Sequence, residues 1–493
     1  DASVNSGHIE AWAGLHAMGV QVWGGSFNNI GTVLAQGAAS GVGIRAESSS
    51  DTSITNSGQI TAIDNTETIN SVGVDLRGSG DHSFTNTGTV TAEIAVNASG
   101  YRYTDNGFTV NNSGTLDGAI HASNTWMDIT NTGTITGDLN LGDGSDTIDS
   151  TGGQIHGVIT AGEGDDLVRG SESDDTIEGG EGDDTLGGGH GEDLMSGGAG
   201  DDIFVLTPDW GNDTVEDFTL GHDLIGLSEG GVQFDDLIIT QDGDNTVISD
   251  GSGNSLTLLN VTAETIDETA FLKGGIMVGT DADETLTDGD GSTKIYAARG
   301  DDTVAGQDGD DTIVGGLGHD RIDGGSGIDT ASYEGSYKGV SIDLSSSGRQ
   351  SSGDATGDRL INIENVIGSS NNDTLVGDGG DNILRGGDKR DALTGAGGDD
   401  TLIGGTGDDV FHFASGWGND VIRDFSRGSN IIEMSGTGLA FSDLVITQSG
   451  DDAVISDGSG NSITLRDVAA TDLTEADFSF DGTIPATDED QGS

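Results

Sequence analysis

The sequence predicts an all-β fold, in which a parallel β-solenoid runs into narrower parallel β-rolls that end in β-hairpin or sandwich caps. Two patterns predict it. Short runs that alternate apolar and polar residues recur between Gly and Asn corners over residues 1–160, and Gly and Asp then recur every nine residues. One repeat of either kind is too small to bury its own apolar face, so successive coils must stack on one another.

Composition excludes several classes of protein. The 493 residues contain 86 acidic and 17 basic side chains, which gives a formal net charge of −69. A protein that binds nucleic acid or anionic lipid needs a basic surface, which this chain cannot form. No apolar run reaches the roughly 18 residues of a membrane-spanning helix. With 32% apolar residues the chain approaches a disordered composition, but its periodicity argues for a solenoid. The start at Asp1, without Met or a signal sequence, predicts a processed chain or a fragment.

Residues 1–160 carry a loose repeat of the form Asn-[Ser/Thr]-Gly-x-apolar, seen for example at 56–60, 86–90 and 131–135. An apolar residue stands two positions before most of the Asn residues, and a second alternating run follows each copy. This texture is typical of short strands joined by tight turns. We therefore predict a parallel β-solenoid over 1–160, in which one polar residue of each coil stacks at a corner: Asn5, Asn29, Asn56, Asn86, Asn112, Asn131 and Ser150.

From residue 161 the period becomes a strict nine residues, written Gly-Gly-x-Gly-x-Asp-x-apolar-x. It fills three blocks, at 161–205, 279–332 and 368–412, and an isolated copy lies earlier, at 141–149. Two nonapeptides make a coil of 18 residues, and the last coils of the N-terminal repeat are 19 residues long. The solenoid should therefore run into the first roll without a flexible linker.

The nonapeptide predicts a metal site built from carboxylate and backbone oxygens. Gly at positions 1, 2 and 4 permits backbone angles closed to other residues and turns carbonyl oxygens inward, while Asp at position 6 supplies a carboxylate. Hard oxygen ligands suit Ca²⁺ rather than Zn²⁺, and this repeat is a described Ca²⁺-binding pattern. The three blocks predict on the order of ten Ca²⁺ ions.

The predicted ligands fall into two sets. The carboxylates are those of Asp146, Asp166, Asp175, Asp184, Asp193, Asp202, Asp213, Asp302, Asp311, Asp320, Asp329, Asp373, Asp391, Asp400, Asp409 and Asp420. The glycines are Gly162, Gly164, Gly180, Gly182, Gly198, Gly200, Gly309, Gly316, Gly318, Gly325, Gly327, Gly398, Gly405 and Gly407. Some copies depart from the pattern and do not favour calcium: Glu284, Thr293 and Asn382 stand at position 6, and Lys389-Arg390 replaces small residues in another copy.

Segments of another texture follow the blocks. Gly197–Lys273 and Gly404–Phe480 align without a gap at an offset of 207 residues, and both contain WGND and VISDGSGNS, the latter a predicted hairpin. They predict capping β units at 206–278 and 413–481. The insertion at 333–367 contains two alternating runs, which predict a strand pair. Residues 482–493 predict a disordered tail.

On these repeats, residues 161–480 resemble the RTX (repeat-in-toxin) proteins that type I secretion exports. The capping units resemble those of alginate epimerases, serralysin-type proteases and large RTX adhesins. The resemblance implies an extracellular, calcium-folded β-roll with an uncleaved C-terminal export signal. Asp477–Phe480 is similar to that signal but is followed by thirteen more residues. Residues 1–160 loosely resemble the β-solenoid passengers of adhesins and surface-layer proteins.

The residues do not favour an enzyme. The sequence has no His-Glu-x-x-His, no Gly-x-Ser-x-Gly and no cysteine, so the usual zinc site and nucleophiles are missing. An enzyme that acts on uronate polymers needs a basic groove, yet residues 1–140 contain no Lys and only Arg45, Arg77 and Arg102. The cluster of Tyr101, Arg102, Tyr103 and Asp105 is better explained as the side chains of a loop between two coils. Three histidines are better explained as surface or turn residues: His8, His16 and His121.

The sequence therefore predicts a secreted, Ca²⁺-dependent structural or adhesive protein of a Gram-negative cell surface, such as a self-assembling surface-layer, matrix or filament subunit. Its expected partners are Ca²⁺, further copies of itself and a cell-surface polysaccharide, with no nucleic acid and no membrane insertion. One alternative is the non-catalytic portion of a secreted polysaccharide-acting enzyme, similar to an alginate epimerase or lyase. Another is an ice-binding or adhesin module, suggested by alternating threonines at 85–91 and 130–136, which are also ordinary strand residues.

Overall fold

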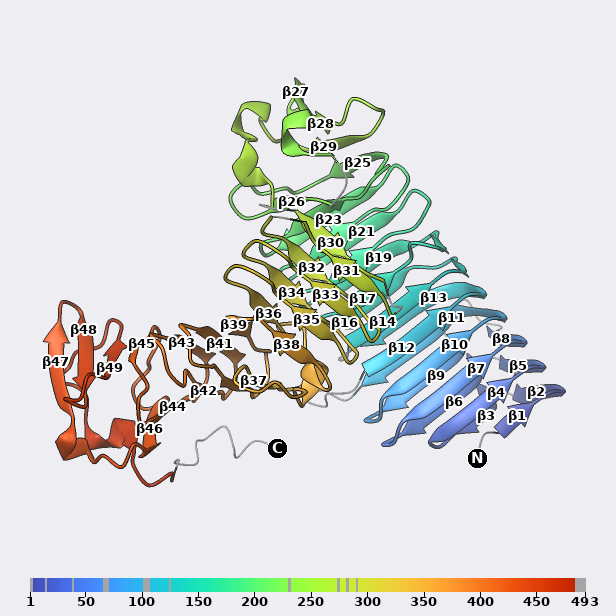
Figure 1. Cartoon of the computed structure of the whole chain (residues 1–493). Coiled ribbons are helices and arrows are strands. Elements are labelled where there is room, and N and C mark those ends of the chain that lie inside the picture. The colour runs from blue at the N-terminus through green and yellow to red at the C-terminus, as the bar shows by residue number, and fades with distance from the viewer. Residues whose placement is uncertain are drawn as a thin grey trace. The chain divides into compact units, whose positions relative to one another are not determined.

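The computed structural model describes residues 3–13, 16–37, 40–64, 71–100, 107–123, 126–228, 232–272, 275–280, 283–289 and 291–483 (Figure 1). Within these ranges the chain forms short β-strands joined by tight turns, and the helical elements are 3-10 turns of three residues each. The all-β prediction is therefore confirmed. The chain divides into two compact units, residues 1–275 and 276–493, and each is described by itself.

Stacked parallel strands form the first unit. One sheet takes one strand from each coil, and a second sheet takes the strands that follow each corner. The first sheet has the order β1 (Ser3–Asn5), β4 (Gly25–Asn29), β7 (Thr52–Asn56), β10 (His82–Asn86), β12 (Gly107–Asn112), β14 (Trp126–Asn131), β17 (Thr147–Asp149), β20 (Leu167–Arg169), β22 (Thr185–Gly187), β24 (Ile203–Leu206) and β26 (Leu224–Leu227). The parallel strands of the second sheet are β2 (His8–Ala13), β3 (His16–Val22), β5 (Thr32–Gly37), β6 (Ser40–Ser48), β8 (Gln59–Asp64), β9 (Val72–Gly78), β11 (Thr89–Gly100), β13 (Thr115–Ser123), β15 (Thr134–Ile135), β16 (Leu139–Asp143), β18 (Gln154–Ile155), β19 (Val158–Glu163), β21 (Thr176–Glu181), β23 (Leu194–Ala199) and β25 (Asn212–Val215).

An asparagine ladder joins successive coils at one corner. The side-chain amide of each Asn donates to Oδ1 of the next Asn, at 2.8 Å both from Asn5 to Asn29 and from Asn56 to Asn86. The ladder ends where Asn131 Nδ2 donates to Ser150 Oγ at 2.9 Å. Since every amide in this buried stack has a partner, the ladder joins the coils without leaving polar groups unsatisfied. The predicted corner stack is confirmed, including Ser150 as its last member.

One column of apolar side chains runs through the first unit. The residues two positions before the ladder residues point inward, are at most 7% exposed, and stack in register with the nonapeptide coils that follow. From the early coils to the last nonapeptide, the column is Phe27, Ile54, Phe84, Val110, Ile129, Ile148, Val168, Leu186 and Phe204. Both kinds of repeat share this core, which confirms that no flexible linker precedes the first roll.

The alternating threonines noted in the sequence lie on both sides of the corner formed by the asparagine ladder. Thr85 lies on β10 in the first sheet, whereas Thr89 and Thr91 lie on β11 in the second. Thr130 and Thr134 are divided in the same way between β14 and β15. Along the chain each set of threonines is therefore divided between two sheets at the Asn corner, whereas across the coils Thr85 pairs with Thr55 and Thr115 pairs with Thr134.

Each unit ends in an antiparallel cap, here also called a flap, which pairs with the last parallel coil. In the first, β25 pairs in parallel with β29 (Ser255–Leu258), which continues into the antiparallel strands β28 (Asn245–Ser249) and β27 (Ile238–Asp242). The second flap repeats this order with β45 (Asn419–Ile422), β49 (Ser462–Leu465), β48 (Asp452–Ser456) and β47 (Val445–Ser449). The turn of each hairpin docks on the last coil, where Asn254 Oδ1 accepts the Gly211 N–H at 3.2 Å and Asn461 Oδ1 accepts the Gly418 N–H at 3.3 Å. The hairpins predicted from VISDGSGNS are thus present.

The second unit is a roll with one continuous and one interrupted face. The continuous sheet contains β30 (Ile276–Val278), β32 (Lys294–Tyr296), β34 (Thr312–Val314), β36 (Thr330–Ser332), β39 (Asn365–Ile367), β41 (Ile383–Asp388), β43 (Thr401–Thr406) and β45. The other face begins as β31 (Thr285–Thr287), β33 (Thr303–Ala305), β35 (Arg321–Asp323) and β38 (Arg359–Ile361). It restarts as β37 (Ser341–Asp343), β40 (Thr374–Val376), β42 (Ala392–Thr394), β44 (Val410–Ala414), β46 (Ile431–Gly436) and β50 (Phe478–Ser479).

The strand pair predicted within the insertion is wrong. Its two alternating runs do form strands, β37 and β39, but β37 pairs with β40 while β39 pairs with β36 and β41. The alternation identified the strands, whereas their partners are set by the coils stacked above and below. The insertion therefore carries one face of the roll across the interruption and restarts the other.

The ladder predicts a stability effect at Asn86. Replacing Asn86 with Ala removes the 2.8 Å bonds that it makes with Asn56 Nδ2 and Asn112 Oδ1, which then keep only longer bonds to the backbone. Each lost hydrogen bond contributes about 0.5–1.5 kcal/mol, so urea unfolding in excess Ca²⁺, followed by circular dichroism, should show a lower stability. Asn111→Ala, on the neighbouring position of β12 outside the ladder, is the control. Equal losses in the two variants would contradict a special role of the ladder.

Candidate calcium sites

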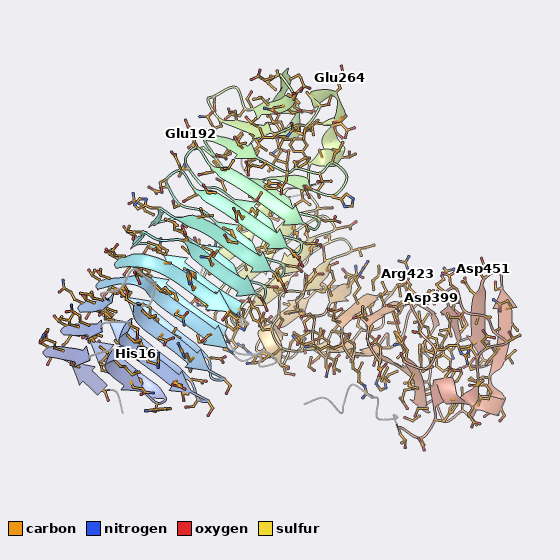
Figure 2. All side chains as sticks on the ribbon, turned by 180° about the vertical axis from the view of Figure 1, so that it is seen from behind. His16, Glu192, Glu264, Asp399, Arg423 and Asp451 are labelled. Atoms are coloured by element: carbon orange, nitrogen blue, oxygen red, sulfur yellow. The ribbon has the colours of Figure 1, made fainter. Side chains whose placement is uncertain are left out.

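The nonapeptide coils hold two kinds of carboxylate. The Asp at position 5 points outward, as Asp399 does in Figure 2, whereas the Asp at position 6, here Asp400, is buried. All of the predicted position-6 aspartates, together with Asp213 and Asp420, are at most 3% exposed. Burying so many carboxylates is costly unless each one has partners.

The glycines make room for these carboxylates. Every predicted glycine has a positive φ, for example +135° at Gly180 and +131° at Gly182, which L residues rarely adopt. A Cβ on Gly180 would also collide with the carbonyl oxygen of Gly162 in the preceding coil. At position 1, a Cβ on Gly179 would collide with Asp184 Oδ2. The pattern Gly-Gly-x-Gly therefore follows from the close approach of backbone and carboxylate.

One oxygen of nearly every buried carboxylate binds the backbone of the preceding coil. Asp175 is the exception, because its Oδ2 accepts the N–H of Ser171 within its own repeat at 2.6 Å. Asp184 Oδ1 accepts the N–H of Asp166 at 2.8 Å, and Asp202 Oδ1 accepts the N–H of Asp184 at 2.9 Å. The second unit repeats the contact, with Asp320 Oδ1 accepting the Asp302 N–H at 2.9 Å. The position-6 residues thus form columns of carboxylates, in which each coil is joined to the next coil on the same side.

The other oxygen of most of these carboxylates is buried without a donor. Among the described residues, no hydrogen bond reaches Oδ2 of Asp146, Asp166, Asp184, Asp193, Asp302, Asp311, Asp320, Asp329, Asp391, Asp400 and Asp420, or Oδ1 of Asp175. A buried anionic oxygen without a partner is strongly unfavourable, and a hard cation would satisfy it. No described cluster of three or more Asp, Glu, His or Cys side chains could hold a metal. Ca²⁺ takes six to eight oxygens, so the remaining ligands would be backbone carbonyls and water.

The carboxylates carry the electrostatic signature of such a column. Burial raises the pKa of Asp184 to about 7, and the neighbouring negative charges of Asp202 and Asp165 add to the rise. Burial likewise raises the pKa of Asp320 to about 8, with Asp358 and Asp302 contributing. In both residues the hydrogen bond from the preceding coil opposes the shift. Without a cation, the folded roll therefore resists full ionisation at neutral pH.

At two position-6 aspartates a neutral side chain of the protein supplies the missing donor, and at a third position an asparagine replaces the carboxylate. Asn430 Nδ2 donates to Asp409 Oδ2 at 3.1 Å, and the Ser369 hydroxyl donates to both oxygens of Asp373. Asn382 donates its own amide to the Glu364 carbonyl at 2.7 Å. Asp373 and Asp409 are both predicted ligands. These contacts distinguish them from the carboxylates that have one buried oxygen without a donor.

Three acidic residues outside the predicted set extend the columns. Asp223 and Asp358 accept the N–H groups of Asp202 at 3.2 Å and Asp320 at 2.9 Å, and Glu364 Oε2 accepts that of Asp329 at 2.8 Å. Their separations of 21, 38 and 35 residues differ from the 18 of the repeat. The sequence period could not identify them, because intervening loops bring them into register.

The remaining sequence candidates do not form a second reactive site in the described residues. Asp75 binds Arg45 Nε and Arg77 Nε, both at 2.8 Å, so the two arginines form a structural ion network. His16 Nδ1 lies 2.6 Å from Ser40 Oγ, and His8 lies 3.6 Å from Glu10. The cluster at Tyr101–Asp105 lies outside the described residues.

Comparison with a known family identifies the same coils. Residues 151–186, 169–204, 278–307, 296–331, 367–395, 376–411 and 385–422 match the family described as RTX calcium-binding nonapeptide repeat (4 copies). The buried carboxylate columns thus belong to the class of calcium-binding β-rolls. The chain carries RTX repeats, which bind Ca²⁺ and are typical of secreted proteins, so the resemblance of these coils to RTX repeats is confirmed.

Wider comparisons add little. The chain is similar to the extracellular lipase LipA from Serratia marcescens, at 16% identity over 73% of this chain and 44% of the lipase chain, with a TM-score of 0.15. At that score the likeness carries no argument, and this chain spans less than half the length of the lipase. No curated protein sequence matches the chain. None of the described helical segments has the length and apolar character needed to cross a membrane.

The raised pKa values predict an unusual pH dependence. The ordinary pKa of Asp is 3.8, whereas the folded, metal-free value is about 7 for Asp184 and about 8 for Asp320. Between these values the folded chain binds more protons than the unfolded chain, so its metal-free stability falls as pH rises. We expect decalcified protein to keep more β-structure and to melt higher at about pH 5.5 than at about pH 8.

Circular dichroism of the decalcified chain at the two pH values tests this expectation. Exposed carboxylates are ionised at both, so their repulsion changes little across this window. In excess Ca²⁺ the stability difference between the two pH values should reverse or vanish, because protons then compete with the cation for the same oxygens. Equal or greater metal-free stability at the higher pH would contradict the assignment.

Proposed function

We propose that this chain is a secreted, Ca²⁺-dependent structural or adhesive protein of a cell surface, which folds and self-assembles outside the cell. The observation that carries the proposal is the column of buried carboxylates, most of which have one oxygen bound to the preceding coil and the other lacking a donor. In this proposal the aspartates named from the sequence supply the carboxylate ligands, and the positive-φ glycines keep the coils close enough to share an ion.

Calcium would act as the folding signal. Without cations, neighbouring carboxylates in a column repel one another, on a chain with a formal net charge of −69. Ca²⁺ at the millimolar level typical of extracellular sites would satisfy the buried oxygens, and metal binding would be coupled to folding. The low Ca²⁺ of the cytosol would leave the rolls unfolded, which suits export by type I secretion.

A structural role fits the surface of the chain better than catalysis. The rolls are structural elements, and acidic side chains such as Glu192, Glu264 and Asp451 stand outward on both units (Figure 2). The alternative is the non-catalytic part of a secreted polysaccharide-acting enzyme, which a basic groove or activity of the whole protein on uronate polymers would favour.

Self-assembly is supported by the first coil. The first coils expose two apolar side chains, Val4 on β1 at 60% and Ile30 directly after β4 at 50%. Exposed apolar side chains favour contact with another protein surface, and non-closing contacts between copies give filaments. We therefore place the contact between copies at Val4 and Ile30.

A Ca²⁺ titration tests both parts of the proposal. Circular dichroism should show the β signal rising as decalcified protein receives Ca²⁺, and light scattering should then show assembly at millimolar Ca²⁺. Val4→Asp with Ile30→Asp should fold with Ca²⁺ but remain monomeric, whereas Val445→Asp, exposed on the second cap, should assemble normally. A β signal unaffected by chelator would refute the folding step. Monodisperse wild-type monomer would refute assembly, and assembly lost only with Val445→Asp would refute its location.

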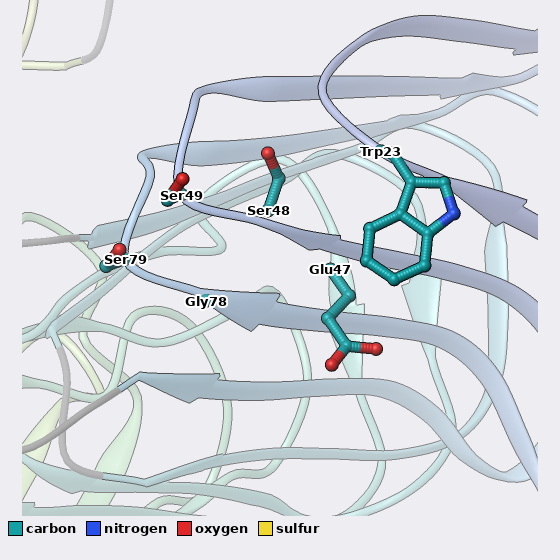
Figure 3. A pocket seen from close by; sticks show the side chains of 6 residues that line it. All are labelled: Trp23, Glu47, Ser48, Ser49, Gly78 and Ser79. Atoms are coloured by element: carbon teal, nitrogen blue, oxygen red, sulfur yellow. The ribbon is translucent and has the colours of Figure 1, made fainter.

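A pocket on the first unit supports an adhesive role. Its volume is about 310 Å³, and it is lined by Trp23, Glu47, Ser48, Ser49, Gly78 and Ser79 (Figure 3). The Trp23 indole, 71% exposed, offers an apolar face beside the Glu47 carboxylate and three serine hydroxyls. An aromatic face next to hydrogen-bonding groups suits a sugar, which has apolar C–H faces and hydroxyl edges.

Affinity electrophoresis in Ca²⁺ tests this pocket. We expect hydroxyethylcellulose, a neutral polysaccharide, to retard the wild-type chain, and Trp23→Ala to abolish at least about nine-tenths of that affinity, a loss of about 1.4 kcal/mol. Ile30→Ala, which also removes an exposed apolar side chain, should bind normally. Polygalacturonate serves as the anionic comparison and should bind less, because the chain is itself acidic. Equal retardation of wild type and Trp23→Ala would refute the site.

A further inference from the structure

One nonapeptide has its carboxylate at an unexpected position. In the copy at 288–296, Thr293 occupies position 6, where the pattern has Asp, and Asp288 occupies position 1, where the pattern has Gly. The structure buries both side chains, leaving Asp288 at 7% and Thr293 at 3% exposure. Asp288 Oδ2 has no hydrogen-bond donor among the described residues. This copy therefore retains a buried anionic oxygen although it lacks the residue that normally supplies one.

The geometry of the regular copies explains why these two positions are interchangeable. In the next copy on the same side, a Cβ at position 1, Gly306, would meet Oδ2 of the position-6 residue Asp311. The Asp288 N–H donates to the Ala305 carbonyl at 2.9 Å, which stacks Asp288 on the Gly306 corner, one coil earlier. A side chain at position 1 thus enters the space that the position-6 carboxylate of its own copy would fill.

The neighbouring coil supplies a second unpartnered oxygen. Asp311 Oδ1 accepts the Thr293 N–H at 2.8 Å, whereas Asp311 Oδ2 has no donor in the described structure and the residue is 1% exposed. Asp288 lies close enough for its charge to act on Asp311: burial raises the pKa of Asp311 to about 6, and the negative charges of Asp329 and Asp288 add to the rise. Two buried carboxylates with spare oxygens on adjacent coils call for a cation between them.

We propose that Asp288 and Asp311 bind a Ca²⁺ ion together, with the first carboxylate moved from position 6 to position 1 of its repeat. The proposal rests on the calcium-dependent folding proposed above and adds a site to it. The remaining ligands would be backbone carbonyls and water, as in the other coils. The ion would secure the first coils of the second unit, at a repeat where the sequence pattern favours none.

Counting bound ions tests the proposal. Native mass spectrometry of the full chain in Ca²⁺ should show one fewer tightly held ion in Asp288→Asn than in wild type. The substitution is nearly isosteric, and its amide can donate to Asp311 as Asn430 does to Asp409, so the coil should remain folded. Asp308→Asn removes the same charge from an exposed position of the next copy on the same side, at 306–314, and should keep the wild-type count. The double variant Asp288→Gly with Thr293→Asp restores the regular pattern and should recover the ion.

The outcomes separate this proposal from the one on which it rests. A wild-type chain that holds no Ca²⁺ would refute the proposed function itself. A wild-type chain that loads Ca²⁺ while Asp288→Asn keeps the full count would refute only the site at Asp288. Equal loss in Asp308→Asn would also overturn it, since the effect would then follow from net charge. If Asp288→Asn fails to fold, the double variant decides, because failure to recover the ion with a folded coil overturns the assignment.

Discussion

The whole structure depends on one constraint, the burial of carboxylates at the corners of the coils. All but one of the column carboxylates accept a backbone N–H of the preceding coil through one oxygen, which holds neighbouring coils close together. The closeness of that contact demands Gly at the neighbouring positions, as the collision of a Cβ on Gly179 with Asp184 shows. The second oxygen makes the fold conditional, because a buried anion without a donor opposes folding until a cation arrives. Glycine content, acidic charge and dependence on calcium are thus consequences of the same corner.

Much of this could be predicted from sequence, because it is periodic. The nine-residue frame identified the buried aspartates and the positive-φ glycines, and the Asn-x-Gly repeat identified the ladder from Asn5 to Ser150. The contacts that could not be predicted involve residues outside the nine-residue repeat. Asp358 and Glu364 enter the columns only after the insertion folds back on the roll, and β37 and β39 take partners in different sheets. Such contacts depend on how loops close in three dimensions, which alternation and spacing do not encode.

The coils differ in how they neutralise the buried oxygen. Where Asn430 faces Asp409, or Ser369 faces Asp373, a neutral donor occupies the place that a cation would take. Asn382 goes further and replaces the carboxylate itself with an amide that binds a carbonyl. Hydrogen bonds of this kind stabilise a coil at any calcium concentration, whereas the unpartnered oxygens of Asp184 or Asp320 do not. The second unit therefore contains both coils that leave a buried oxygen without a donor and coils in which a neutral group satisfies that position.

The coils of the asparagine ladder can fold without calcium and so provide a starting point for the coils that follow. Its coils are joined by side-chain amides and an apolar column, and neither contact involves an ion. Each coil of a solenoid contacts only its neighbours, so growth on an existing end avoids the cost of a new nucleus. The apolar column continues without a break from Ile148 to Val168. The first nonapeptide coil can therefore pack directly on the last coil of the asparagine ladder. We therefore expect this unit to fold outward from the ladder coils, with each calcium coil added to the one before it as Ca²⁺ binds.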